Sequence, residues 1–175
     1  MCNELKFKIS NTIKYTIELE ADNIQINILI EYETRYVLSN LGLICNHSTK
    51  AKYDNGSVIT GFECTRVGND KVNTTIFDFM INEEHQCKGL GTFILAKLHL
   101  FTPDLITKNL TISGKLTTDD NSPQRNALYR NLIGSSRLAI DKDGDGNFEG
   151  AFNDLSDRYK DKINIIDISF ESCGE

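Results

Sequence analysis

The chain of 175 residues has no tryptophan, only two prolines and no excess of basic residues. Its 19 Lys and Arg residues stand against 25 Asp and Glu residues, which gives a formal net charge of -6 and an isoelectric point near 5.1. A nucleic-acid-binding domain with a broad basic face has the opposite balance, so the composition argues against nucleic acid as a partner. With 39% apolar residues, the chain is predicted to form one compact domain rather than a disordered or fibrous structure.

Paired cysteines and long apolar runs are also missing. The five cysteines are widely spaced and form no Cys-x-x-Cys pair, so we expect free thiols in a reducing compartment. No run of eighteen apolar residues occurs, and the first ten residues, MCNELKFKIS, contain no apolar core of signal-peptide length. The sequence therefore predicts a cytoplasmic protein without a membrane contact.

The first seventy residues carry the pattern of β-strands. Apolar residues recur at every second position, most clearly from Ile13 to Leu19 and from Ile24 to Ile30. Turn residues separate these runs, at Ala21 to Asn23, Asp54 to Gly56 and Gly68 to Asp70. Residues 1–70 are therefore predicted to form a meander of antiparallel strands.

The pattern changes after residue 71. A buried strand is predicted over 72–81, an amphipathic helix over 89–101, a second strand over 109–116 and a second helix over 122–132. Two strands joined by a helix predict a right-handed parallel crossover. Further strands are expected at 137–140, 147–152 and 163–170.

These elements predict the fold class, a mixed α/β (α+β) domain with a twisted sheet and flanking helices. We divide residues 1–175 into a strand-rich N-terminal part (1–70), a core (72–134) and C-terminal strands (135–175). No linker and no second domain are expected.

The most informative segment is QCKGLGT, Gln86 to Thr92, which follows a predicted strand and opens a predicted helix. The first backbone N–H groups of a helix have no intrahelical partner, and the helix dipole favours an anion there. Gly89 and Gly91 would let the backbone approach a phosphate closely. The segment therefore predicts a site for a pyrophosphate.

Two common phosphate-binding loops fit this segment poorly. A Walker A loop requires Gly-x-x-x-x-Gly-Lys-Ser/Thr, which is absent. The dinucleotide fingerprint requires a third glycine where Ile94 stands, and an acidic residue at the end of the next strand, where Gly114 to Thr118 has none.

The segment is similar to the signature Gln/Arg-x-x-Gly-x-Gly/Ala of the GCN5-related N-acetyltransferase (GNAT) family, which follows the fourth strand of that family. Gln86, Gly89 and Gly91 match it, and NALYRNLIG, residues 126–134, resembles the Leu-Tyr-x-x-x-Gly segment on a later helix. The joint resemblance covers residues 72–134. The family has two early helices that shape its acceptor pocket, whereas this sequence predicts strands there.

The resemblance implies a site for acetyl-coenzyme A. The pyrophosphate would be held by the loop residues Gln86, Cys87, Lys88, Gly89, Leu90, Gly91 and Thr92. Family members splay the strand before this loop from the next strand, so the exposed edge at Met80 and Ile81 would pair with the pantetheine amides. Asn121, or alternatively Asn126, would hydrogen-bond the pantetheine arm.

The resemblance also implies the catalytic residues. Tyr129 would protonate the departing thiolate, because the pKa of a phenol, about 10, lies near that of a thiol. Asp78, Glu83, Glu84 or His85 could accept the proton of the amine, and of these we select Asp78. His85 is interpreted as a solvated loop residue.

The predicted activity is transfer of an acetyl group from acetyl-coenzyme A to an amine by direct attack in a ternary complex. The acceptor, a small molecule or a protein, is left open. Two alternatives are a GNAT-fold binding module without turnover and a β-rich protein-interaction domain that does not bind coenzyme A. Edge strands could also pair between two copies, which would give a homodimer.

A second motif, DKDGDGNFEG at residues 141–150, begins like a calcium-binding loop. The twelfth position is Phe152, where such a loop requires a bidentate glutamate, and strands rather than helices flank the motif. We therefore predict a glycine-rich hairpin and assign no metal site, with weak divalent-ion binding by Asp141, Asp143 and Asp145 as the alternative.

Overall fold

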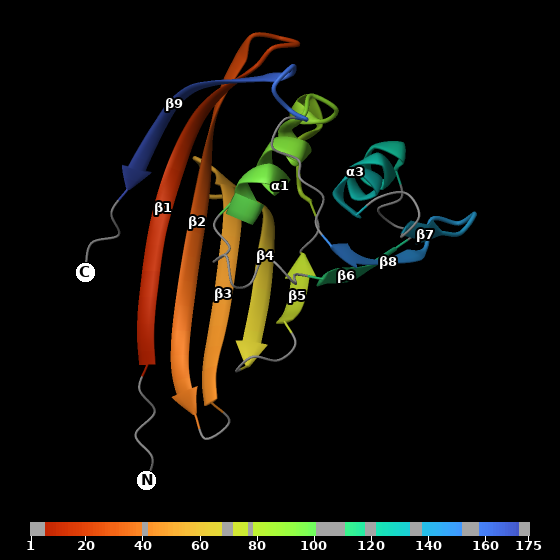
Figure 1. The fold of residues 1–175 in the computed structure, drawn as a ribbon. Helices are drawn as coiled ribbons and strands as arrows, with labels where there is room; N and C mark the ends of the chain where they lie inside the picture. Colours follow the sequence, from red (N-terminus) through yellow and green to blue (C-terminus); the bar gives the residue numbers. More distant parts are fainter. Residues whose placement is uncertain are drawn as a thin grey trace.

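The largest element of the fold is a six-stranded antiparallel sheet. The computed structural model describes residues 6–39, 42–67, 72–76, 79–100, 111–117, 122–133, 138–151 and 158–171. Its large sheet has the order β5-β4-β3-β2-β1-β9 (Figure 1). The strands are β1 (Lys6–Leu19), β2 (Ile24–Ser39), β3 (Gly42–Tyr53), β4 (Val58–Val67), β5 (Val72–Ile76) and β9 (Ile163–Glu171).

The first four strands form the meander that the period-two pattern predicts, and β5, expected as part of the core, continues it by pairing with β4. Turns lie between β1 and β2, where Asn23 has a positive φ of 53°, and between β3 and β4, where Gly56 has a φ of 86°. The predicted turn at 68–70 lies outside the described residues. Strand β9 then pairs with β1 and becomes the edge strand opposite β5, a position that the chain order alone does not predict.

The two faces of the large sheet differ in chemistry. The inner face, toward the helices, carries Tyr15, Ile28, Ala51 and Phe62, all buried. The outer face carries ion pairs, such as Lys8 with Glu33 and Lys52 with Glu31. Hydrogen bonding to Lys8 lowers the pKa of Glu33. This alternation is typical of an antiparallel sheet that packs on one side and meets water on the other.

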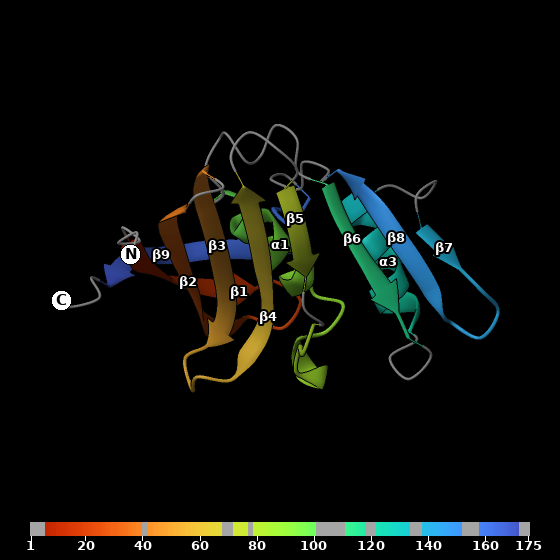
Figure 2. The same ribbon diagram turned by 90° about the horizontal axis from the view of Figure 1, so that it is seen from below.

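A second, three-stranded antiparallel sheet has the order β6-β8-β7. Its strands are β6 (Thr111–Leu116), β7 (Leu138–Ile140) and β8 (Gly146–Ala151). Strands β5 and β6 lie side by side in Figure 2, but β5 pairs with β4 and β6 pairs with β8. The strand-helix-strand unit is present as predicted, but the expected parallel crossover within one sheet is wrong, because its two strands belong to different sheets.

The helices lie on one side of the two sheets (Figures 1 and 2). Helix α1 (Leu90–Leu100) packs on the large sheet, and α3 (Pro123–Ile133) packs on β7 and β8. A short 3-10 helix, η1 (Glu83–His85), precedes α1. One cluster of buried side chains joins both helices to both sheets. Within the described ranges, no helix is long and apolar enough to cross a membrane.

The predicted helices agree with the observed ones to within one or two residues, but the first core strand is shorter than predicted. β5 ends at Ile76 instead of Ile81, and residues 79–82 have no regular secondary structure. Met80 donates its N–H to the carbonyl of Ile59 at 2.7 Å, so this segment still contacts the start of β4. The fold is therefore mixed α+β and dominated by strands.

A buried lysine attaches α1 to the large sheet. The Nζ of Lys97 lies over three aromatic rings, 5.3 Å from the centroid of Tyr15, 5.5 Å from Phe93 and 5.4 Å from Tyr159. Cation-π contacts of a desolvated ammonium contribute about 2 kcal/mol. The cluster joins α1, β1 and the turn before β9.

Part of the inner face of the large sheet carries exposed apolar side chains. We call this surface the bare patch; it consists of Phe7, Ile9, Leu38, Leu43, Ile168 and Phe170. The strand registers place all six on the same face as the buried Tyr15 and Ile28. In Figure 1, α1 crosses only the end of the sheet that holds the β1–β2 and β3–β4 turns.

Candidate functional site

The loop from Gln86 to Thr92 has the backbone of a helix N-terminus. Cys87 and Gly89 have positive φ angles of 62° and 86°. The first hydrogen bond of α1 runs from the N–H of Phe93 to the carbonyl of Gly89, at 2.9 Å. The N–H groups of Leu90, Gly91 and Thr92 therefore have no intrahelical acceptor. No acidic residue occupies the first turn of α1.

Side chains of the loop hold its shape. The side-chain amide of Gln86 donates to the carbonyl of Ile81 at 3.0 Å, so this residue ties the loop to the segment before it. Lys88, one of the loop residues expected to hold the pyrophosphate, forms an ion pair with Asp22 in the β1–β2 turn. Cys87 is an exposed free thiol.

The two glycines of the loop have different roles. A Cβ on Gly91 would lie 3.2 Å from Leu128 and 3.3 Å from Ile81, so glycine there allows α1 to pack closely on α3. The structure therefore gives Gly91 a packing role, and its role toward a phosphate stays a prediction. Gly89 has a left-handed backbone, and its Cβ would lie 3.0 Å from Cβ of Lys162.

The residues proposed for the pantetheine arm lie in different environments. Met80 is 69% exposed, whereas Ile81 packs against the core. Leu90 is buried, so only its backbone faces a ligand. The prediction that Met80 and Ile81 form a strand edge is wrong, because neither residue is in a strand. Asn121 lies outside the described residues.

The structure places Tyr129 in the core. Its side chain is 4% exposed, and its ring lies 4.8 Å from the ring of Phe148, centroid to centroid. Asn126, the alternative to Asn121, accepts a hydrogen bond from the Nε of Arg125 on the same helix. Asp78, the selected base, lies outside the described residues.

His85 is not the solvated loop residue that the sequence predicted. It is 6% exposed, and its Nδ1 lies 3.1 Å from the hydroxyl of Tyr53, to which the N–H of Asn82 also donates at 3.2 Å. Burial, with the carboxylate of Glu84 nearby, raises the pKa of Tyr53, so the phenol keeps its proton. The Nε2 of His85 lies 3.6 Å from the carboxylate of Glu84.

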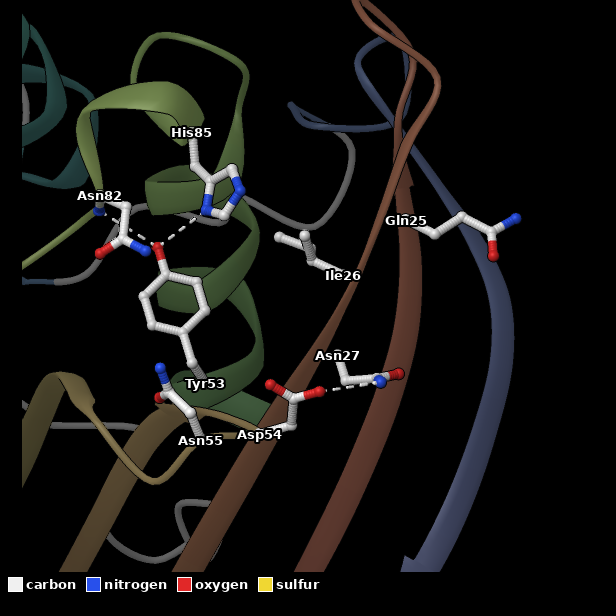
Figure 3. A pocket seen from close by; sticks show the side chains of 8 residues that line it. All are labelled: Gln25, Ile26, Asn27, Tyr53, Asp54, Asn55, Asn82 and His85. Atoms are coloured by element: carbon white, nitrogen blue, oxygen red, sulfur yellow. Dashed lines mark hydrogen bonds between the residues drawn. The ribbon is translucent and has the colours of Figure 1, made fainter.

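A cavity of about 210 Å³ opens beside this Tyr53 and His85 pair (Figure 3). It lies between the start of β2, the β3–β4 turn and η1. Its lining is mostly polar and consists of Gln25, Ile26, Asn27, Tyr53, Asp54, Asn55, Asn82 and His85. The sequence did not predict this site, because three separate segments form it. Tyr53 lies near Asn27 only because the strand register pairs Tyr53 with Ile28.

Other ionisable groups are buried within the large sheet. The two ring nitrogens of His47 form hydrogen bonds with the hydroxyls of Thr34, at 2.9 Å, and Thr49, at 3.1 Å. Burial lowers the pKa of His47 to about 4. Cys45 and Cys64 are buried free thiols, and burial raises the pKa of Cys64 to about 12. Cys2 and Cys173 lie outside the described residues.

The segment after β7 is the predicted hairpin. Strands β7 and β8 pair antiparallel, and Oδ1 of Asp141 accepts the N–H groups of Asp143 at 2.9 Å and Asp145 at 3.0 Å. That carboxylate thus holds the turn. Among the residues that the structure describes, no group of three or more His, Cys, Asp or Glu side chains is arranged to hold a metal ion.

Comparison of the chain with family models, with curated protein sequences and with solved structures finds no match.

Proposed function

We propose that the protein is an N-acetyltransferase that transfers an acetyl group from acetyl-coenzyme A to an amine, with a GNAT-like fold. The observation that carries the proposal is the position of the Gln86–Thr92 loop. The loop opens α1 with N–H groups that have no intrahelical acceptor, and α1 connects strands of two separate sheets. The resemblance implies this arrangement, in which the strand before the loop separates from the next strand.

The loop has the electrostatic character that a pyrophosphate requires. Three N–H groups at the start of α1 point along the helix axis, where the helix dipole carries about half a positive charge. Its first turn has no carboxylate that would repel an anion. Because Lys88 is paired with Asp22, backbone dipoles rather than a free lysine would supply most of the attraction.

In the proposed reaction, the acceptor nitrogen attacks the thioester carbonyl carbon and the carbon-sulfur bond breaks. Asp78 takes the proton that the nitrogen loses, and Tyr129 protonates the coenzyme thiolate. The contact between Tyr129 and Phe148 fixes the ring, so Tyr129→Phe should keep the packing and lower turnover. Coenzyme affinity should not change.

The donor site is tested by Thr92→Glu, with Thr92→Gln as the matched control. Thr92 is the third residue of α1, where a glutamate interacts favourably with the helix dipole, so the variant should fold normally. Its carboxylate should repel the pyrophosphate. We expect acetyl-coenzyme A to raise the thermal unfolding temperature of the wild type and of Thr92→Gln, but not of Thr92→Glu.

An equal shift in Thr92→Glu would contradict the loop assignment, and no shift in the wild type at millimolar acetyl-coenzyme A would contradict donor binding. At 100 times its dissociation constant, a ligand stabilises the native state by about 2.7 kcal/mol. Gly89→Arg is a poorer test, because Gly89 has a φ of 86° and little space toward Lys162. Such a variant would lose stability for reasons unrelated to binding.

The bare patch supports a second candidate function, a β-rich interaction domain that associates with a second copy of itself. Patches of this kind are uncommon on monomers and mark interaction sites. Strand β9 is also an edge strand of the described large sheet and contains neither proline nor lysine, which usually protect such edges. Antiparallel pairing of two β9 strands around Ile168 would place Asp167 opposite Ser169, so no like charges would meet.

Light scattering after size-exclusion chromatography tests this homodimer. The wild type should be a dimer at micromolar concentration, and Ile168→Lys should be a monomer. Val58→Lys, which changes another exposed apolar residue away from the bare patch, should remain a dimer. A monomeric wild type, or a dimeric Ile168→Lys, would exclude association through β9.

A further inference from the structure

The cavity beside Tyr53 and His85 has a definite chemical character. One side of the cavity is formed by the buried, hydrogen-bonded pair of Tyr53 and His85, and the N–H of Asn82 also donates to the Tyr53 hydroxyl. Among the described residues that line the cavity, Asp54 is the one carboxylate, and none is a lysine or an arginine. The site is therefore polar and negatively charged, which disfavours an anion and an apolar ligand.

Several polar atoms of the lining still have hydrogen-bonding capacity. Oδ2 of Asp54 accepts from Asn27 at 3.2 Å, whereas Oδ1 has no partner among the described residues and points to the Tyr53 side (Figure 3). The side-chain amide of Asn82 and the NH₂ group of Asn55 likewise have no partner in the described part of the chain. Gln25 is turned away from the other residues.

These atoms match a particular class of ligand. A carboxylate oxygen with no other partner is an acceptor for an ammonium group, and carboxamides both donate to and accept from hydroxyls. Among the described residues, no group of three or more His, Cys, Asp or Glu side chains is placed here to hold a metal ion. The volume of about 210 Å³ fits a molecule the size of a monosaccharide.

We propose that this cavity binds a small hydrophilic molecule that carries a protonated amine and several hydroxyls, such as an amino sugar. The ammonium group lies against Oδ1 of Asp54. The hydroxyls contact the side chains of Asn55 and Asn82, and the Tyr53 and His85 pair forms one side of the cavity. Binding here does not depend on the donor loop.

Glucosamine and glucose are matched probes for this site, because they differ only in the amine that replaces one hydroxyl. Titrations are followed by backbone amide NMR shifts, at a pH at which the amine is protonated. We expect glucosamine to shift the amides of Asp54, Asn55 and Asn82 and to bind at least tenfold more tightly than glucose. Equal affinities, or no shift at 100 mM glucosamine, would overturn the proposal.

Asp54→Asn tests the contact with the ammonium group. The variant keeps the shape and can still bond to Asn27, so it should fold and lose at least tenfold in affinity for glucosamine. Asp143→Asn, an equal charge change in the β7–β8 turn, should bind as the wild type does. Thr92→Glu should also leave glucosamine binding unchanged, which separates this site from the donor loop. Unchanged binding in Asp54→Asn would refute the proposed contact.

Discussion

The inner face of the large sheet has two regions of similar sequence and opposite exposure. Where α1 covers it, Ile17 and Ile30 are fully buried. In the bare patch, Ile9 is 41% exposed and Phe170 is 77% exposed. Both regions continue the same period-two pattern along the same strands, so the pattern determines which face is apolar but not which part of that face is covered.

The difference has a geometric cause. The eleven residues of α1 span about 16 Å at 1.5 Å per residue, whereas the sixteen residues of β2 span about 53 Å at 3.3 Å per residue. A helix of that length cannot cover strands of that length. The strands are therefore longer than the packing of α1 requires, and the extra length leaves apolar side chains exposed.

The largest expected effect is a difference in the free energy of unfolding between two variants of β1, one with a substitution in each region. Ile17→Ala removes a fully buried side chain beneath α1 and should lower the free energy of unfolding by about 3 kcal/mol. Ile9→Ala, on the same face of β1, should change it by less than about 0.5 kcal/mol. Urea unfolding of both variants measures the contrast, and equal losses would show that the bare patch is packed in solution.

The second effect concerns His47, which lies in the same cross-strand row as Ile9 but is 2% exposed. Its pKa is lowered to about 4 in the folded protein, against about 6.5 when unfolded. Between these values only the unfolded chain takes up the proton, so stability falls as the pH falls. From pH 7 to pH 5 this loss is about 2 kcal/mol.

Replacing the imidazole should remove that part of the pH dependence. The difference between urea-unfolding free energies at pH 7 and pH 5 should be about 2 kcal/mol smaller in His47→Gln than in the wild type. An identical difference in the two proteins would mean that His47 is accessible to protons in the folded state.

The smallest effect compares a crowded glycine with an open one. Gly89 and Gly56 share a φ of 86°, but a Cβ at Gly89 would meet Lys162 at 3.0 Å, whereas a Cβ at Gly56 has nothing within 4 Å. Gly56→Ala should cost about 1 kcal/mol, the conformational strain alone. Gly89→Ala should cost about 1 kcal/mol more, as thermal unfolding would show, and equal costs would mean that Lys162 moves aside.

Local elements were predictable from the sequence because their signals are local. Alternation from Ile13 to Ile30 predicted β1 and β2, and Pro123 marked the start of α3, where the structure places it. The hairpin after β7 followed from Asp141 and the glycines after it. Each of these features depends on residues within a few positions of one another.

Features that depend on distant residues were not predictable. Strand β9 pairs with β1, and β5 and β6 belong to two separate sheets. Both features depend on contacts between distant parts of the chain, which a local sequence pattern does not predict. His85 was misjudged because its polar neighbours in sequence suggest exposure, whereas Tyr53, more than thirty residues earlier, buries it. The packing role of Gly91 likewise depends on Leu128 in another helix.

The pairing of β1 with β9 also determines when the edge of β1 becomes paired during synthesis. β1 leaves the ribosome before its partner β9, because β9 follows it in the chain after all the other described strands. Until β9 emerges, the edge of β1 beside Ile13 and Tyr15 stays unpaired, a state in which nascent chains associate with one another. The growing chain is therefore most vulnerable after β1 to β5 have emerged and before β9 has, when five of the six described strands of this sheet are present.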